Sequence, residues 1–262
     1  MKRDLVSLAD WSSEEIWEVL ELAAHLKREL RAGVDHRHIL AGKTLAMVFQ
    51  KPSLRTRVSF ETGMTQLGGH AIYLGPEDIK LGKRETTEDI AIVLSRYVDG
   101  IMARVFDHEI VEELARYATV PVINGLSDLL HPCQALGDML TIWEKRRRLS
   151  GLVLAFIGDG NNVAHSLIHA SARLGLSFRI ACPEGYEPDE AIVDWARDQG
   201  AEVKILREPQ EAARGADVLY TDVWASMGEE AIAEKKRHAF SGYTIDQDLI
   251  EQANPGALVM HC

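Results

Sequence analysis

The chain has 262 residues, and its 29 basic residues against 40 acidic ones give a net charge of −11 at pH 7. This acidic balance excludes a general nucleic-acid-binding or anionic-membrane-binding surface, so neither nucleic acid nor a membrane is expected as a partner. The length exceeds that of a typical single domain and predicts two domains of ~120 to 140 residues each.

The N-terminus and the cysteines indicate where the protein is located and which structural sites it lacks. The first residues show no apolar signal region, and no window approaches ~18 uninterrupted apolar residues, so we expect a cytoplasmic protein. Cys133, Cys182 and Cys262 form no C-x-x-C pair, which argues against a disulfide framework or a structural zinc site. We therefore expect no structural metal site, and no cofactor is expected either.

In chain order, a capping box at 12–15 begins an amphipathic helix. Apolar runs then predict strands at 44–49, 71–74, 100–104 and 120–123, separated by helical patterns at 57–67, 87–97 and 109–117. After a helix at 135–145, the rhythm restarts at Gly151, with strands at 152–157, 177–181, 202–205, 218–221 and 257–260. Strands that alternate with helices predict an α/β fold of two domains, each a mostly parallel sheet with helices on both faces. The predicted domains are 1–134 and 151–262, with a linking helix at 135–150.

The segment Ser53-Leu54-Arg55-Thr56-Arg57 lies between a predicted strand and a predicted helix. Free N–H groups, the positive end of the helix dipole, two hydroxyls and two guanidinium groups can converge there on a phosphate or carboxylate. The alternative is an ordinary N-cap followed by surface arginines that form ion pairs.

The second polar segment, His131-Pro132-Cys133-Gln134, opens the helix at 135–145. Pro132 is tolerated in a first turn, His131 could polarise a carbonyl oxygen, and Gln134 could bond an amide group. A histidine in a loop can also be purely structural.

The third segment, Asp222 to Gly228, follows the strand at 218–221. Asp222 and Ser226 supply a carboxylate and a hydroxyl suited to a substrate ammonium group. The alternative is an Asx or Ser cap.

A strand that ends in Gly158-Asp159-Gly160 leaves a dinucleotide site open as another interpretation. Val163 stands where the third glycine of that motif belongs, and Ala181-Cys182-Pro183 closes the next strand without an acidic residue. Both departures disfavour nicotinamide binding.

Taken together and in order, these segments resemble the aspartate/ornithine transcarbamylase family, and more narrowly its ornithine-using branch. The resemblance covers nearly the whole chain. It rests on S-L-R-T-R, Leu81-Gly82-Lys83-Arg84-Glu85, Met102-Ala103-Arg104, Asn124-Gly125-Leu126-Ser127-Asp128, H-P-C-Q, G-D-G-N-N at 158–162, D-V-W-A-S-M-G and the final His261-Cys262.

The resemblance implies a transferase that moves the carbamoyl group of carbamoyl phosphate to the δ-amine of L-ornithine, giving L-citrulline and phosphate. It implies that the first domain binds carbamoyl phosphate and the second binds ornithine. The carbamoyl phosphate ligands it implies are Ser53, Leu54, Arg55, Thr56, Lys80, Arg104, His131 and Gln134. The ornithine ligands are Asn162, Asp222, Ser226 and Met227, and the catalytic residues are Arg104, His131 and Cys262.

The resemblance also implies a homotrimer, or a multiple of trimers, in which Lys80 reaches a neighbour's site. Leu54 replaces the first threonine of the family's S-T-R-T-R loop, and backbone donation can survive that change. The family pattern continues for several dozen residues beyond His261-Cys262, so we expect a missing tail with one more substrate-binding arginine and a final helix.

Two alternative functions remain. One is a sister transcarbamylase that uses putrescine or an acylated ornithine, although the S-M-G turn favours free ornithine. The other is a non-catalytic subunit that retains the fold. The sequence does not distinguish a biosynthetic from a catabolic role.

Overall fold

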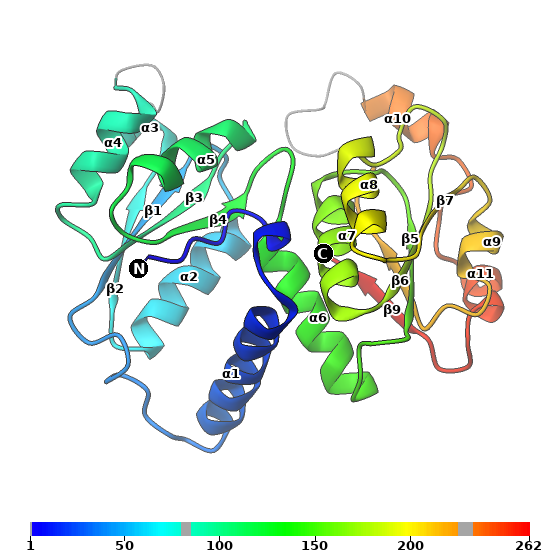
Figure 1. The fold of residues 1–262 in the computed structure, drawn as a ribbon, viewed down its shortest axis with the longest axis horizontal. Helices are drawn as coiled ribbons and strands as arrows, with labels where there is room; N and C mark the ends of the chain where they lie inside the picture. Colours follow the sequence, from blue (N-terminus) through cyan, green and yellow to red (C-terminus); the bar gives the residue numbers. More distant parts are fainter. Residues whose placement is uncertain (1, 80–84, 225–232) are drawn as a thin grey trace. The chain divides into compact units, whose positions relative to one another are not determined.

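The computed structural model describes residues 2–79, 85–224 and 233–262. They form two compact units (Figure 1), one made of Met1–Trp11 and Trp17–Cys133, the other of Ser12–Ile16 and Gln134–Cys262. The predicted first domain ends one residue beyond this division. Helix α6 (Pro132–Arg146) crosses it, in the part of the chain where a linking helix was expected.

The described part of the first unit contains a four-stranded sheet. Its strands are β1 (Thr44–Phe49), β2 (His70–Leu74), β3 (Gly100–Arg104) and β4 (Val122–Leu126), in the order β2-β1-β3-β4, and every pairing is parallel. One face carries Ala46, Val48 and Ile101 against α4 (Thr87–Leu94) and α5 (His108–Tyr117). The other face carries Leu45, Met47, Phe49 and Met102 against α2 (Leu54–Gln66).

The described part of the second unit contains a five-stranded parallel sheet. Its strands are β5 (Val153–Ile157), β6 (Ser177–Ala181), β7 (Val203–Leu206), β8 (Val218–Thr221) and β9 (Leu258–His261), in the order β7-β6-β5-β8-β9. Helices α9 (Pro209–Ala213) and α11 (Gln247–Gln252) cover one face, where they bury Ala155, Ile157 and Leu219. Helix α7 (Asn162–Leu174) packs against β6 and against α8 (Glu190–Asp198).

The remaining helices are η1 (Leu8–Asp10), α1 (Ser13–Arg31), α3 (Pro76–Ile79) and α10 (Ala233–Ala239). The predicted capping box of α1 is confirmed: the Ser12 N–H donates to Glu15 Oε2 at 2.8 Å, and the Glu15 N–H donates to Ser12 Oγ at 3.2 Å. Two parallel sheets with helices on both faces confirm the predicted fold class. Within the described ranges, no helix combines the length and the hydrophobicity needed to cross a bilayer.

The fourth predicted strand was placed too early, at 120–123, whereas β4 covers Val122–Leu126. Pro121 has no N–H to donate, so the strand begins after it. Asn124 and Gly125 look like loop residues in sequence, but hydrogen bonds extend the strand through them. The Asn124 N–H donates to the Leu5 carbonyl at 2.8 Å, and Asn124 Nδ2 donates to the Val6 carbonyl at 3.1 Å.

Candidate active site

The N-terminus of α2 gathers hydroxyl groups, as the sequence predicted, and the guanidinium group in contact with them is that of Arg104. Ser53 is the N-cap, and its Oγ accepts from the Thr56 N–H at 3.3 Å and donates to Thr56 Oγ1 at 3.1 Å. Arg104, at the end of β3, donates from Nη1 to the same Thr56 Oγ1 at 3.4 Å. These contacts hold three polar groups in place beside the positive end of the helix dipole, which favours an anion.

Arg104 reaches this position from a strand end that is locally irregular. The pairing of β3 with β4 shifts register between Ala103 and Arg104, and Gly125 is the extra residue opposite the shift. A Cβ on Gly125 would stand 2.6 Å from Met102 Sδ and 3.2 Å from the Ala103 carbonyl oxygen, so a larger residue there would have to displace the Met102 side chain. Arg104 is only 7% exposed, and burial lowers its pKa, but a guanidinium still keeps its charge at neutral pH. A buried permanent cation is well suited to bind a phosphate or a developing oxyanion.

The three other residues of the loop, Leu54, Arg55 and Arg57, differ in their exposure and in their contacts. Leu54 is 80% exposed, consistent with a contribution from its backbone alone. Arg55 is exposed and makes no hydrogen bond or ion pair with another described residue. Arg57 instead donates to Glu61 Oε1 at 2.8 Å and lies 4.0 Å from the centroid of the Tyr73 ring. Of the two guanidinium groups expected at the anion, Arg57 is thus directed away, and Arg55 remains available.

The segment His131-Pro132-Cys133-Gln134 opens α6, with Pro132 in the first position of the helix. Burial, and secondarily the charge of Arg104, lowers the pKa of His131 to about 3. At any working pH His131 is therefore a neutral imidazole, which can donate one N–H to a carbonyl oxygen. Burial raises the pKa of Cys133 to about 12, and its Sγ donates to the Asn124 carbonyl at 3.4 Å, so this thiol is structural.

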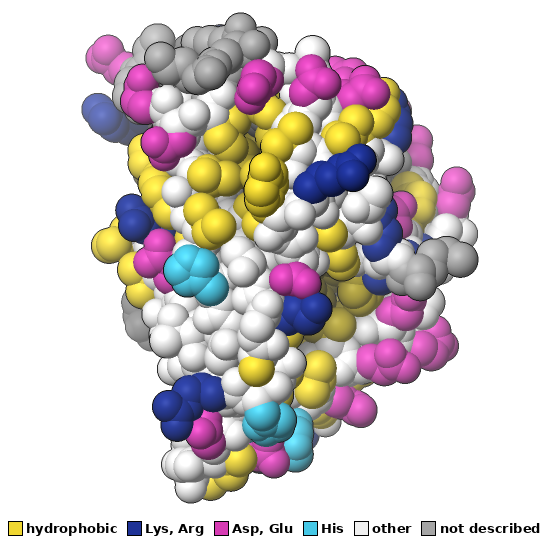
Figure 2. All heavy atoms as spheres, turned by 90° about the vertical axis from the view of Figure 1, so that its left-hand side faces the viewer, with side chains coloured by type: hydrophobic (Ala, Val, Ile, Leu, Met, Phe, Trp, Pro, Cys, Tyr) yellow, Lys and Arg dark blue, Asp and Glu magenta, His cyan; other side chains and the backbone are white. Residues whose placement is uncertain are grey.

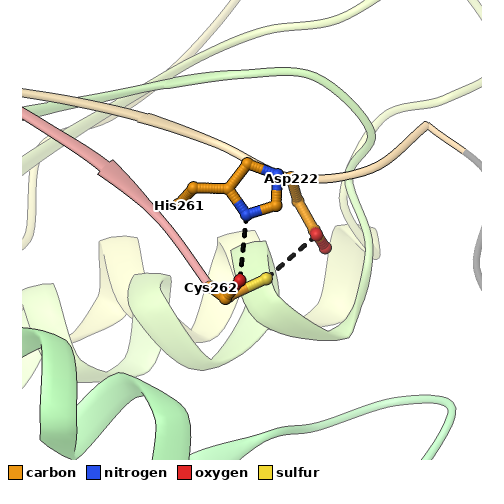
Figure 3. A group of neighbouring side chains, drawn as sticks. All are labelled: Asp222, His261 and Cys262. Atoms are coloured by element: carbon orange, nitrogen blue, oxygen red, sulfur yellow. Dashed lines mark hydrogen bonds between the residues drawn. The ribbon is translucent and has the colours of Figure 1, made fainter.

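In the second unit, the ends of three elements bring polar groups to Asp222. Asn161 Nδ2 donates to Asp222 Oδ2 at 2.8 Å, and Cys262 Sγ donates to Asp222 Oδ1 at 2.9 Å. Burial and the neighbouring Asp222 raise the pKa of the Cys262 thiol, which therefore remains a protonated donor. Figure 3 shows the thiol directed at the carboxylate. Asp222 Oδ1 also accepts from the Val223 N–H at 2.7 Å, so a local backbone contact accompanies the two side-chain donors that orient the carboxylate.

His261 completes this cluster at the end of β9. Its Nδ1 donates to the carbonyl of Cys262 at 2.9 Å (Figure 3). The ligand atoms of Asp222, His261 and Cys262 lie within 4.8 Å of one another. In this arrangement the Cys262 thiol donates to Asp222, so a metal ion that bound all three groups would have to displace the thiol proton.

The turn at Gly158-Asp159-Gly160 serves packing and capping. The side chain of Asn161 caps α7 by accepting from the N–H groups of Val163 and Ala164, at 3.0 and 3.2 Å. The backbone of residues 187–188 approaches so closely that a Cβ on Gly160 would stand 2.2 Å from the nitrogen of Pro188. A dinucleotide pyrophosphate needs these N–H groups and this space, so the turn does not fit the nicotinamide interpretation.

Asn162, Lys80, Ser226 and Met227 are the remaining predicted site residues. Asn162 is the first residue of α7, next to Asn161, which binds Asp222. Lys80, Ser226 and Met227 lie outside the described residues.

The sequence interpretation missed two polar residues near the predicted site, Asp138 and Asn161. Asp138 is buried one helical turn after Gln134 and accepts a hydrogen bond from it at 3.0 Å. The i, i+4 spacing of Gln134 and Asp138 was the available signal. For Asn161, the signal was its position just before an apolar helical pattern, where an N-cap is expected.

Comparison with known proteins gives matches over both units. Residues 3–144 match the family described as aspartate/ornithine carbamoyltransferase, carbamoyl-P binding domain, and residues 150–262 match its Asp/Orn binding domain. A relative from Pyrococcus furiosus, named anabolic ornithine carbamoyltransferase, is 55% identical over 99% of this chain and 84% of its own length.

Solved structures give the same result. The ornithine carbamoyltransferase of Pyrococcus furiosus superposes with a TM-score of 0.95 at 55% identity, covering 99% of this chain and 84% of the other. The anabolic ornithine carbamoyltransferase of Campylobacter jejuni superposes with a TM-score of 0.92 at 40% identity, covering 100% of this chain and 86% of the other.

Proposed function

The chain belongs to the aspartate/ornithine carbamoyltransferase family, and we propose that it transfers the carbamoyl group of carbamoyl phosphate to the δ-amine of L-ornithine, giving L-citrulline and phosphate. The observation that carries this proposal is the 55% identity, over 99% of the chain, to a relative named for the ornithine reaction. The preorganised polar groups at the start of α2 and around Asp222 support it independently.

For carbamoyl phosphate, the first unit supplies most of the ligands. Ser53, Arg55 and Thr56 hold the phosphate together with the backbone N–H of Leu54. The contacts among Ser53, Thr56 and Arg104 support this assignment, because donors that are already in place need little reorganisation when the leaving phosphate gains charge. Lys80, from a neighbouring subunit, is a further candidate ligand.

At the carbamoyl carbon, Arg104 and His131 donate to the carbonyl oxygen, and Gln134 accepts from the carbamoyl NH₂. The neutral δ-amine of ornithine attacks the carbonyl carbon, and the oxygen becomes an anion in the tetrahedral intermediate. The C–O bond to phosphate then breaks, and the extra proton of the attacking nitrogen passes to the departing phosphate. A buried guanidinium and a neutral imidazole donor both stabilise the oxyanion.

For ornithine, we assign the amine end to Asp222 and the α-amino and α-carboxylate groups to Asn162, Ser226 and the Met227 backbone. Asp222 is held from both sides by Asn161 and Cys262, which leaves its carboxylate in a fixed direction. A carboxylate beside the amine pocket favours a cationic diamino acid over an anionic substrate.

The test is citrulline formation by the purified protein, with putrescine, acetylornithine and aspartate assayed as competing acceptors. We expect ornithine to give the highest kcat/KM. A higher value for putrescine or acetylornithine would identify a sister transcarbamylase instead. No carbamoylation of any acceptor would leave a non-catalytic subunit as the better interpretation.

We also propose a role in arginine biosynthesis in the cytoplasm, which is consistent with the word anabolic in the names of two relatives. A strain that lacks its own enzyme and needs arginine should grow on minimal medium when it expresses this gene. Failure to grow, despite activity in the extract, would favour the catabolic direction.

We propose a homotrimer. Strand β2 is at the edge of the first sheet and leaves Ile72 38% exposed, while α4 leaves Val93 54% exposed. Figure 2, viewed from the side where β2 and α4 lie in Figure 1, shows hydrophobic side chains gathered in the upper part of this face. An apolar face at a sheet edge fits a contact with a second copy of the chain. Light scattering should give three chain masses, and a monomer would contradict the proposal.

A further inference from the structure

Asp138 is a buried carboxylate within hydrogen-bonding reach of the proposed carbamoyl phosphate ligand Gln134. It lies on α6, is 5% exposed, and accepts from Gln134 Nε2 through Oδ1 at 3.0 Å. Its other oxygen, Oδ2, accepts from the hydroxyl of Tyr220 at 2.8 Å. Tyr220, on β8, is completely buried. The three side chains form one chain of hydrogen bonds in which both donors point at the same carboxylate.

The direction of these bonds fixes the amide of Gln134. An ionised carboxylate only accepts hydrogen bonds, so the NH₂ end of the amide must face Asp138. The carbonyl oxygen Oε1 is then directed the other way. A glutamine without this neighbour could present either end to a ligand, because the two ends have nearly the same shape.

We propose that Asp138, held by Tyr220, is a positioning residue for carbamoyl transfer: it fixes the Gln134 amide so that Oε1, an acceptor, meets the NH₂ group of carbamoyl phosphate. This inference rests on the proposed function. It also separates substrates. Acetyl phosphate has a methyl group in place of that NH₂ and offers no donor to Oε1, and a carboxylated analogue would place an acceptor against an acceptor.

Burying the Asp138 carboxylate costs free energy, which argues against a purely structural role for it. Burial, and the nearby charge of Asp222, raise the pKa of Asp138 to about 6, while the hydrogen bonds from Tyr220 and Gln134 oppose that rise. Cys262 is a further titratable neighbour, and its thiol, like the Tyr220 hydroxyl, keeps its proton because its pKa is raised. Joining α6 to β8 could be done by apolar side chains without burying a carboxylate.

The direct test is Asp138→Asn, which keeps the shape and replaces one acceptor with a donor. The Tyr220 hydroxyl still needs the remaining acceptor, so the new NH₂ faces Gln134 and turns its Oε1 inward. The NH₂ group of Gln134 then faces the NH₂ group of carbamoyl phosphate, and two donors cannot form a hydrogen bond with each other. The KM for carbamoyl phosphate should rise about tenfold or more, while the KM for ornithine should change less than about twofold.

The dependence of the carbamoyl phosphate KM on pH distinguishes a positioning role from a structural one, because a purely structural role would not affect it. In the wild type, the carbamoyl phosphate KM should rise as the pH falls through about 6, because protonated Asp138 no longer accepts on both oxygens. This inflection should be absent in Asp138→Asn. Titration of the substrate phosphate affects both proteins equally and cancels in the comparison.

A second variant, Tyr220→Phe, keeps the proposal testable if Asp138→Asn does not fold. Loss of the Tyr220 hydrogen bond raises the pKa of Asp138 further, so the inflection in KM should move to higher pH.

The matched control is Asp217→Asn. Asp217 precedes β8 at its opposite end and accepts from the Val153 N–H at 2.9 Å and from Asn254 at 3.0 Å. The Asp217→Asn protein should be less stable than the wild type, with no change in the carbamoyl phosphate KM or in the pH profile of that KM.

The outcomes separate the inference from the function it rests on. If the wild type forms no citrulline, the proposed function fails. If Gln134→Ala raises the carbamoyl phosphate KM but folded Asp138→Asn keeps the wild-type KM and pH inflection, only the positioning role is overturned. Equal increases in both substrate KM values, with a lowered melting temperature and an unchanged inflection, would make Asp138 a structural link and also overturn the proposal.

Discussion

Replacing Arg55 with alanine should remove carbamoyl phosphate affinity without harming the fold. Arg55 is exposed at the start of α2 and makes no hydrogen bond or ion pair with another described residue, so the folded protein loses little with it, ~0.5 kcal/mol or less. In the complex, each charge-assisted hydrogen bond to the phosphate contributes ~1.5 to 3 kcal/mol. That energy corresponds to a rise in the carbamoyl phosphate Kd of roughly 10- to 150-fold.

Arg57 is a matched control two residues away on the same turn. It donates to Glu61 and lies over Tyr73, contacts that contribute ~0.5 to 1 kcal/mol to folding and none to the ligand. Arg57→Ala should therefore lower stability slightly and leave the carbamoyl phosphate Kd unchanged. Arg55→Lys should restore little affinity, because an ammonium group lacks the two parallel donors.

The assay is calorimetric titration of carbamoyl phosphate, or of a stable analogue, into each folded variant, with thermal melts run in parallel. Near-normal binding by folded Arg55→Ala would refute the phosphate assignment. The reasoning would also fail if Arg57→Ala weakened binding as much as Arg55→Ala did, because the contacts of Arg57 would then not explain its role.

The other predictions concern the second unit and the amine. Asp222→Asn should weaken ornithine binding by about tenfold and change carbamoyl phosphate binding little, as measured by the two KM values; equal losses would indicate a structural cap. Lys236 donates to Asp159 at 2.7 Å with its side chain 7% exposed, so Lys236→Met should lower the free energy of unfolding by ~3 kcal/mol in urea titrations, and adding Asp159→Asn should recover part of that loss. Between pH 7 and 9, log kcat/KM for ornithine should rise by about one unit per pH unit, because only the neutral amine attacks and its reference pKa is ~10.4; a flat profile would require a base on the protein.

The fold could be predicted where a single sequence signal dominates. Strands β1 and β3 were predicted with their observed bounds, because each is a continuous apolar run and both lie in the centre of their sheet. Strand β4 was misplaced because its polar residues are paired by Leu5 and Val6, more than 100 residues away in the chain. Local patterns carry no information about such partners.

The candidate site shows the same division. Ser53 and Thr56 were proposed from residue type and position, and Arg104 from the family resemblance; the contacts among the three are seen only in the structure. The network around Asp138 was not identified, because Tyr220 reads as one more apolar residue of a buried strand. Its hydroxyl needs a partner, and only the packing of β8 against α6 supplies it.

The protonation states of the site bear on where the amine loses its proton. Ornithine arrives with a cationic amine, and the described groups near the chemistry are weak acceptors for that proton. His131, with a pKa of about 3, holds a proton poorly, and the Cys262 thiol already carries one. Asp222 accepts from Asn161 through Oδ2 and from Cys262 through Oδ1, which fixes its direction and leaves acceptor sites for the substrate. We therefore expect the amine to lose its proton to solvent before it attacks, and we expect Arg104 and His131 to act by positioning the carbamoyl group and stabilising the oxyanion rather than as a general base.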